Sequence, residues 1–340
     1  MNIAEFYKGK TIFLSGTTGF VGKVVLEKFI RSLPDFRRIY VMVRPKKSIS
    51  VQERLEKEIL NAEIFSKAYA ENPGLKETLR QKLVAVGGDL IIDRLGIDPE
   101  VRKVLVKELD AIINVAASVN FDDPLLDAIQ INYMGCMRML ELAKECEHLE
   151  VFTHVSTAYT NSNRSGRVEE MVYDMDDPRD PEEIIDNIIK MGPQRVQEQE
   201  KQIIGSWPNT YTYTKFMAER ALKKKHGSLR VCVIRPSIIV SCYDEPCRGW
   251  TDTLAAGGGL TFSIHMGLIK YVKTYPQLVV DLIPCDFVSN IIICGTVFVA
   301  KLPQPQMRIF HSASSGKNPF TIIRFRDNIA KAGRYHEYLR

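Results

Sequence analysis

The feature that most constrains the fold is a strand, a glycine turn and a helix near the start of the chain. Residues 11–14 are Thr, Ile, Phe and Leu, which predict a short buried strand. Gly16, Gly19 and Gly22 follow at intervals of three, and apolar residues then recur at helical spacing. This order is typical of the turn that binds a dinucleotide, because the helix N-terminus carries partial positive charge for the pyrophosphate.

Each glycine has its own predicted role in this turn. Gly16 permits a tight turn, Gly19 lets backbone N–H groups approach a phosphate, and Gly22 lets the helix pack closely on the strand. The cofactor-binding residues expected here are Gly16, Thr17, Thr18, Gly19, Phe20, Val21 and Gly22.

Further apolar runs predict an α/β fold with a doubly wound parallel sheet of the Rossmann type. The expected later strands are 39–43, 83–86, 110–116, 151–157, 229–234 and 307–312. Residues 51–82 predict one long helix with an insertion around Asn72-Pro73-Gly74, and Gly257 to Gly259 predict a flexible loop. We expect a cofactor domain over residues 1–240 with a helical insertion at 164–207. Residues 241–340 should form mostly a smaller substrate-binding lobe, with some elements returning to the main domain.

Composition excludes several function classes. The formal net charge of +5 over 340 residues, without a long basic run, argues against nucleic acid binding. The seven cysteines are scattered without a CxxC, and the six histidines lack paired spacing, so we expect neither a disulfide framework nor a metal. The N-terminus has no apolar core of a signal peptide, and the longest apolar run, 291–300, is too short to span a bilayer. The chain as given is expected to be soluble.

The ends of the predicted strands carry the remaining cofactor candidates. Arg44 ends the second strand, where an acidic residue would favour NAD, so a guanidinium there predicts NADP with its 2′-phosphate. Asp89 follows the third strand and is expected to accept from adenine or to cap the turn. The other candidates at strand ends are Leu90, Ala116, Ala117 and Pro236.

A tyrosine and a lysine four residues apart provide the candidate chemistry. Tyr211 and Lys215 lie on one face of a predicted helix, and of the 13 tyrosines only Tyr211 has a lysine at this spacing. The lysine should lower the pKa of the tyrosine and hold the nicotinamide ribose, and the tyrosine should protonate a carbonyl oxygen. Thr157 or Ser156, at the end of the fifth strand, should hydrogen-bond the same oxygen. Tyr213 lacks the lysine partner.

The motifs in their order resemble the fatty acyl-CoA reductases, the male-sterility family of extended short-chain dehydrogenase/reductases. They are GTTGFVGK, RPK, GDL, VAASVNFDD, HVSTAYTN, PNTYTYTK, IRPSIIV, GWTD and LIPCDFVSN, and they cover the chain from Gly9 to about Pro319. The resemblance implies that NADPH reduces a long-chain acyl-CoA thioester to a fatty alcohol through a bound aldehyde.

The resemblance also assigns residues. It implies cofactor binding by Gly16, Gly19, Gly22, Arg44, Asp89 and Lys215, and catalysis by Tyr211, Lys215 and a hydroxyl at Thr157 or Ser156. Segments 164–207 and 241–282 would shape the acyl and CoA sites, with Trp250 and Phe262 as candidate tunnel residues. The family often has His where this chain has Asn114.

The family usually continues with a helical C-terminal domain that is often membrane-associated, whereas this chain stops at Arg340. The resemblance therefore leaves full activity and membrane attachment open, and it implies a cytosol-facing place at the endoplasmic reticulum or peroxisome membrane. Three alternatives remain open: a carrier-protein thioester reductase, a sugar-nucleotide reductase or epimerase, and an NADPH-binding regulatory protein. The oligomeric state is not indicated by the sequence.

Overall fold

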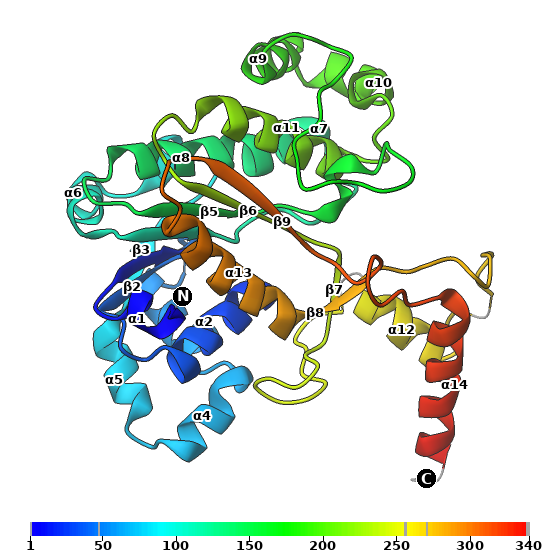
Figure 1. Ribbon diagram of the computed structural model, residues 1–340, viewed down its shortest axis with the longest axis horizontal. Coiled ribbons are helices and arrows are strands. Elements are labelled where there is room, and N and C mark those ends of the chain that lie inside the picture. Colours follow the sequence, from blue (N-terminus) through cyan, green and yellow to red (C-terminus); the bar gives the residue numbers. More distant parts are fainter. Residues whose placement is uncertain (1, 47, 255–256, 270, 338–340) are drawn as a thin grey trace.

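A seven-stranded parallel sheet forms the centre of the molecule (Figure 1). The computed structural model describes residues 2–46, 48–254, 257–269 and 271–337. The strand order is β3-β2-β1-β4-β5-β6-β9. The strands are β1 (Thr11–Leu14), β2 (Arg38–Val43), β3 (Leu83–Gly87), β4 (Ala111–Asn114), β5 (Val151–Val155), β6 (Val231–Pro236) and β9 (Met307–Ser312). The predicted doubly wound parallel α/β fold is confirmed.

The strand order reverses between β1 and β4, which is the place where open α/β sheets have a crevice. The chain runs outward from β1 through β2 to β3 and then returns to place β4 on the other side of β1. Ligands of open α/β sheets bind outside the carboxyl ends of the strands at such a reversal. The glycine turn follows β1, and Ala116 and Ala117 follow β4, so the predicted cofactor residues flank this crevice.

Helices cover both faces of the sheet (Figure 1). Alternation along β1 assigns the faces, because Ile12 and Leu14 pack in one apolar cluster and Phe13 packs in the other. Helices α2 and α13 contribute to the first cluster, and α6, α8 and α11 contribute to the second. The helices are α1 (Ile3–Tyr7), α2 (Phe20–Ser32), α3 (Val51–Arg54), α4 (Ser66–Glu71), α5 (Leu75–Lys82), α6 (Pro99–Glu108), α7 (Leu125–Ala128), α8 (Gly135–Glu145), α9 (Pro181–Met191), α10 (Pro193–Ile204), α11 (Thr210–Lys225), α12 (Gly257–His265), α13 (Cys285–Ala300) and α14 (Ile322–Glu337).

A fully buried ion pair ties the segment before α9 to the sheet. Arg235 on β6 and Glu219 on α11 are both inaccessible to solvent, and their Nη2 and Oε2 atoms lie 2.5 Å apart. The same guanidinium donates to the carbonyl of Met171 at 2.9 Å. A buried arginine needs such partners for its several donors, so this pair fixes where the chain leaves the sheet toward α9 and α10.

The last third of the chain extends beyond the main sheet (Figure 1). A small parallel sheet joins β7 (Ile238–Val240) to β8 (Leu282–Pro284), and α12 and α14 project from it. The predicted loop at 257–259 is wrong, because α12 begins at Gly257. A Cβ on Gly259 would lie 2.2 Å from the carbonyl oxygen of Leu254, so the glycine permits a close backbone approach at the start of the helix.

The prediction of one long helix over 51–82 is also wrong. Helix α3 continues into a π-helical turn at Leu55–Leu60, and the extended backbone of Ala62 then breaks the helix. The wider turn places Leu55, Ile59 and Leu60 in the core. A second break separates α4 from α5 at Asn72-Pro73-Gly74, where the sequence predicted an insertion.

Among the described residues, no helix is both long enough and apolar enough to cross a bilayer.

Candidate active site

The glycine turn is held by contacts that a side chain would block. Gly16 has a φ of 78°, which favours glycine, and a Cβ there would lie 2.9 Å from the backbone nitrogen of Ala116. A Cβ on Gly22 would lie only 2.1 Å from the carbonyl oxygen of Gly16. The turn, the first turn of α2 and the end of β4 are therefore packed backbone against backbone.

The start of α2 fits a phosphate group. Gly19 is the N-cap residue and makes no side-chain capping bond, so Phe20, Val21 and Gly22 begin the helix with backbone N–H groups that have no partner inside it. The hydroxyl of Thr17 is buried and has no hydrogen-bond partner within the described part of the chain. Free N–H groups at the positive end of a helix and an unpartnered hydroxyl suit the pyrophosphate of a dinucleotide. Thr18 lies between them in the turn.

The residues predicted to meet the adenosine end lie together. The Nε atom of Arg44 is 3.1 Å from Oδ2 of Asp89, and the arginine side chain is 60% exposed. Oδ1 of Asp89 also accepts from the backbone N–H of Ile91 at 3.2 Å, so the turn-capping role considered for this residue is present. Leu90 is buried, and a Cβ on Gly135 of α8 would lie 2.8 Å from its Cβ.

The catalytic candidates converge at the carboxyl end of β5. Lys215 on α11 is buried, and its Nζ donates to the carbonyl of Val155 at 2.8 Å. Thr157 donates to the carbonyl of Pro236 at 3.4 Å, which joins the ends of β5 and β6. Ser156 is buried and its hydroxyl has no partner among the residues described. A hydrogen bond links the Tyr211 phenol to Thr157, so a tyrosine, a lysine and hydroxyls meet at one edge of the sheet.

The pKa of Tyr211 corrects one prediction. Burial of the phenol raises its pKa to about 12, although the hydrogen bond with Thr157 acts in the opposite direction. Burial likewise lowers the pKa of Lys215 to about 8. The lysine was expected to lower the pKa of the tyrosine, but its ammonium is engaged with the Val155 carbonyl instead. In this state the tyrosine is a protonated acid at neutral pH, which is the form that donates a proton.

The two neighbouring tyrosines have different environments. Tyr211 is partly exposed, and its ring packs against Phe121, with 5.5 Å between the ring centroids. Tyr213 is buried against Trp207 in the core beneath α11, with 5.7 Å between centroids. Only Tyr211 reaches the strand ends, as its spacing to Lys215 indicated.

Asn132 supports this end of the sheet from inside a helix. It lies buried in a π-helical turn between α7 and α8. Its Oδ1 accepts from the backbone N–H of Ser118 at 3.0 Å, and its Nδ2 donates to Thr214 on α11 at 3.3 Å. Asn132 therefore links the segment after β4 to the helix that carries Tyr211 and Lys215.

Ser15, Asn114 and His154 were not predicted as a unit. They form a buried hydrogen-bonded row beneath the crevice, from the residue after β1 through the end of β4 to β5. The only signal in the sequence was a single polar residue at or beside each apolar strand. The pairing of strands far apart in sequence brings these three residues together.

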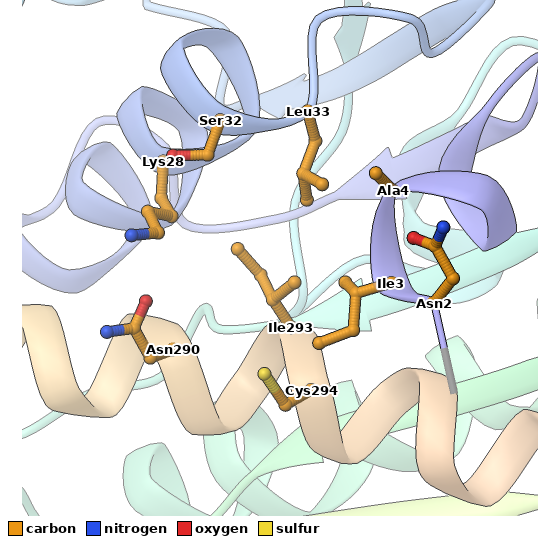
Figure 2. Close-up of a pocket in the computed structure, with 9 residues that line it drawn as sticks. All are labelled: Asn2, Ile3, Ala4, Lys28, Ser32, Leu33, Asn290, Ile293 and Cys294. Atoms are coloured by element: carbon orange, nitrogen blue, oxygen red, sulfur yellow. The ribbon is translucent and has the colours of Figure 1, made fainter.

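The predicted tunnel residues lie in different surroundings. Trp250 stacks on Phe20, the first residue of α2, with ring centroids 5.7 Å apart. Phe262 on α12 is about half exposed. Figure 2 shows a pocket of about 620 Å³ that none of the predicted site residues lines. It lies between α1, α2 and α13, where Lys28, Leu33, Asn290 and Ile293 face one another, whereas Tyr211 and Lys215 belong to α11.

Within the described residues, no cluster of three or more His, Cys, Asp or Glu side chains is arranged to hold a metal ion.

Known proteins are similar to this chain in sequence and in fold. Fatty acyl-CoA reductase 2 of Bos taurus is 36% identical over 317 residues, which cover 93% of this chain and 60% of the relative. Fatty acyl-CoA reductase 1 of Homo sapiens is 34% identical over 320 residues, which cover 94% and 61% respectively. The chain thus spans about three fifths of the length of these curated relatives.

Solved structures agree on the fold. The terminal R domain of the myxalamid PKS-NRPS pathway superposes with a TM-score of 0.65 at 23% identity, covering 95% of this chain and 70% of that one. The reductase domain of a nonribosomal peptide synthetase from Mycobacterium tuberculosis gives 0.65 at 19% identity, covering 98% and 75%. The model of an NAD-binding family described as male sterility protein matches residues 14–292. On this match the chain belongs to the male sterility protein family.

Proposed function

We propose that this chain carries the reductase site of a fatty acyl-CoA reductase, which reduces a long-chain acyl-CoA with NADPH to a fatty alcohol through a bound aldehyde. The observation that carries the proposal is the meeting of Tyr211, Thr157 and Lys215 at the carboxyl end of β5. The identity to fatty acyl-CoA reductases supports the choice of substrate class.

We infer that the cofactor lies across the crevice. The first turn of α2 and the Thr17 hydroxyl would hold the pyrophosphate, and Ala116, Ala117 and Pro236 would line the strand ends. Arg44 would pair with the 2′-phosphate, since Asp89 engages its Nε and the exposed side chain has further N–H groups to donate. This contact is the reason to propose NADPH over NADH.

The chain's own residues would supply the proton and the hydrogen bonds that the reaction needs. Bound NADPH supplies the hydride. Tyr211 would donate a proton to the substrate oxygen as negative charge develops there, and Thr157 or Ser156 would donate a hydrogen bond to the same oxygen. The resulting hemithioacetal would lose CoA to leave an aldehyde, and a second reduction at the same site would give the alcohol. Lys215, one helical turn after Tyr211, would hold the nicotinamide ribose.

A substrate panel tests this function. We expect NADPH oxidation with palmitoyl-CoA, and none with UDP- or GDP-sugars. Turnover of a palmitoyl carrier protein but not of palmitoyl-CoA would move the chain to the carrier-protein thioester reductases. NADPH binding without oxidation by any member of the panel would favour the regulatory alternative.

Affinity for acyl-CoAs of different length tests the acyl site separately. Each buried methylene contributes about 0.8 kcal/mol, so C16 acyl-CoA should bind far more tightly than C8, and C8 more tightly than C2. Calorimetry measures this even where turnover is slow. Equal affinity for the three would show that no acyl tunnel forms.

We further propose that the protein works at the cytosolic face of the endoplasmic reticulum or peroxisome membrane, where long-chain substrates and products partition. Fractionation of cells that make the protein tests this, and recovery away from both membranes would contradict it.

A further inference from the structure

Ser15 clamps the glycine turn to the end of β4. Its Oγ accepts from the backbone N–H groups of Val115 and Ala116, both at 3.0 Å. Ser15 directly precedes Gly16, whose turn approaches Ala116 so closely that a Cβ would not fit. This one hydroxyl therefore sets the spacing between the two backbones that flank the crevice.

The hydrogen bonds of this row fix where each proton lies. With two N–H groups already donating to its oxygen, Ser15 uses its single hydrogen to donate to Oδ1 of Asn114 at 2.7 Å. The Asn114 amide then presents Nδ2 to Nδ1 of His154 at 3.2 Å. Since Nδ2 can only donate, Nδ1 of His154 must be an unprotonated acceptor, and the proton of the neutral ring lies on Nε2.

The surroundings of His154 agree with a neutral ring. Burial and the nearby charge of Lys215 hold the pKa of His154 well below its usual range. The groups that face the ring are the Asn114 amide on β4, the Cys136 thiol on α8, 3.6 Å from Nδ1, and Lys215 on α11. Glu219 also acts on Lys215 but is paired with Arg235.

The row ends next to the lysine of the candidate site. His154 immediately precedes Val155, whose carbonyl accepts the Lys215 ammonium at 2.8 Å. Adjacent residues of β5 therefore hold the two ends of this arrangement, the His154 side chain toward Asn114 and the Val155 carbonyl toward Lys215. A shift of the His154 ring would move the acceptor of Lys215, and a shift of Ser15 would move the glycine turn.

We propose that Ser15, Asn114 and His154 form a positioning row in which His154 couples the glycine turn to the β5 carbonyl that holds Lys215. All three side chains are buried, so we assign them a positioning role: they set the relative position of the two backbone segments that flank the crevice. The inference rests on the proposed function, because it assumes that a dinucleotide binds across the crevice.

Three variants on β5 test the row. His154→Leu removes the acceptor of Asn114, whereas His154→Asn restores an amide oxygen near the position of Nδ1. Thr153→Val is the matched control, because Thr153 is equally buried on the same strand but bonds Thr296 on the opposite face at 2.8 Å. The readouts are NADPH affinity by fluorescence titration, the KM and kcat for palmitoyl-CoA, and the melting temperature.

His154→Leu leaves the buried amide of Asn114 without an acceptor. We therefore expect this variant to bind NADPH at least about 5-fold more weakly. His154→Asn should bind within about 2-fold of the unmodified chain, because its oxygen satisfies the same donor. Thr153→Val should lower the melting temperature without changing NADPH affinity. Equal NADPH affinity of His154→Leu and Thr153→Val, at matched melting temperatures, would contradict the positioning role of the row.

The proton position gives a readout that needs no variant to fold. Nitrogen NMR of histidine-labelled protein should show His154 neutral with the proton on Nε2 at pH 6 to 8. A proton on Nδ1, or a charged ring in this range, would overturn the proposal. If the unmodified chain binds no dinucleotide, the proposed function is wrong and this inference falls with it. If the chain binds NADPH but His154 carries its proton on Nδ1, only the positioning role is wrong.

Discussion

The glycine turn and the described residues between Leu254 and Leu282 differ in what fixes their structure. In the turn, Gly16 and Gly22 bring backbones within distances that no side chain allows, and the neighbouring strands are buried. In the later segment, apolar side chains such as Leu268, Tyr271 and Tyr275 face solvent. The difference indicates that changes in the turn should abolish cofactor binding, whereas changes in the later segment should alter substrate choice and leave the fold intact.

The largest effect is expected at Gly22. Gly22→Ala places a Cβ 2.1 Å from the Gly16 oxygen and 2.8 Å from the Thr17 nitrogen, and both are backbone atoms. We expect a loss of about 3 kcal/mol or more of unfolding free energy, with no measurable NADPH binding. Gly316→Ala is the control, since a Cβ there contacts nothing within 4 Å. Chemical denaturation measures the unfolding free energy of both variants. Equal stability of the two would show that the turn is not packed in this way.

The next largest effect concerns the two tyrosines of α11. Tyr211→Phe removes the proposed proton donor, so activity should fall by at least about 10²-fold while NADPH affinity is retained. Tyr213→Phe keeps the aromatic core contact with Trp207 and should stay active. Steady-state kinetics with palmitoyl-CoA compare them. An inactive Tyr213→Phe beside an active Tyr211→Phe would reverse the assignment.

Removal of the buried lysine should stabilise the chain while inactivating it. The pKa of Lys215 falls from its ordinary 10.5 to about 8. Below pH 8 both the folded and the unfolded chain carry the charge, so the folded state bears the full cost of burying it. Each pKa unit is worth about 1.4 kcal/mol.

Lys215→Met should therefore raise the unfolding free energy at pH 7 by about 2 kcal/mol, after the loss of the Val155 hydrogen bond. The difference should shrink as pH rises from 8 toward 10.5, because the unfolded lysine then binds more protons than the folded one. Denaturation at a series of pH values tests the sign. A difference that grows across this range would contradict the burial of a charged lysine.

A smaller effect is expected at the cofactor's adenosine end. Arg44→Asp should weaken NADPH binding by about tenfold or more and leave NADH binding less affected, because one charge-assisted contact is lost. Arg248→Asp is the control, since Arg248 is also well exposed but lies on the loop before α12. Titration of each variant with NADPH and NADH tests this contact. Equal affinity of the unmodified chain for NADH and NADPH would refute the assignment of Arg44 to the 2′-phosphate.

The smallest effect on stability is expected in the later segment. Phe262→Ala should change the unfolding free energy by less than about 0.5 kcal/mol, because the side chain is half exposed. Affinity for palmitoyl-CoA should nevertheless fall while that for acetyl-CoA stays the same. Val104→Ala on α6, a similarly exposed apolar side chain, should change neither affinity. Calorimetry with the two acyl-CoAs distinguishes these outcomes.

Patterns within short stretches of sequence predicted the glycine turn and the strands of the main sheet. The glycine spacing predicted the turn, and each apolar run predicted a strand of the main sheet. The sequence did not predict β7 and β8, because each has only three residues and its partner lies more than 40 positions away. The break at Ala62 and the helix at Gly257 depend on tertiary packing and close backbone contacts, which overrode the local pattern.

The candidate site divides in the same way. Tyr211 and Lys215 share one helix, so their spacing sufficed to pair them. The row from Ser15 to His154 depends on the register of three strands, which sequence alone does not provide. The pKa of Tyr211 was predicted in the wrong direction, because burial of the phenol raises it and burial depends on elements far apart in the sequence.

Product analysis of a single-turnover reaction tests the central claim most directly. The chain, NADPH and palmitoyl-CoA are mixed, and free CoA, aldehyde and alcohol are quantified by mass spectrometry, with Tyr211→Phe in parallel. We expect the unmodified chain to release one CoA and form one hexadecanol for two NADPH oxidised, and Tyr211→Phe to release almost none. NADPH bound by the chain without release of CoA from any acyl length would contradict the account.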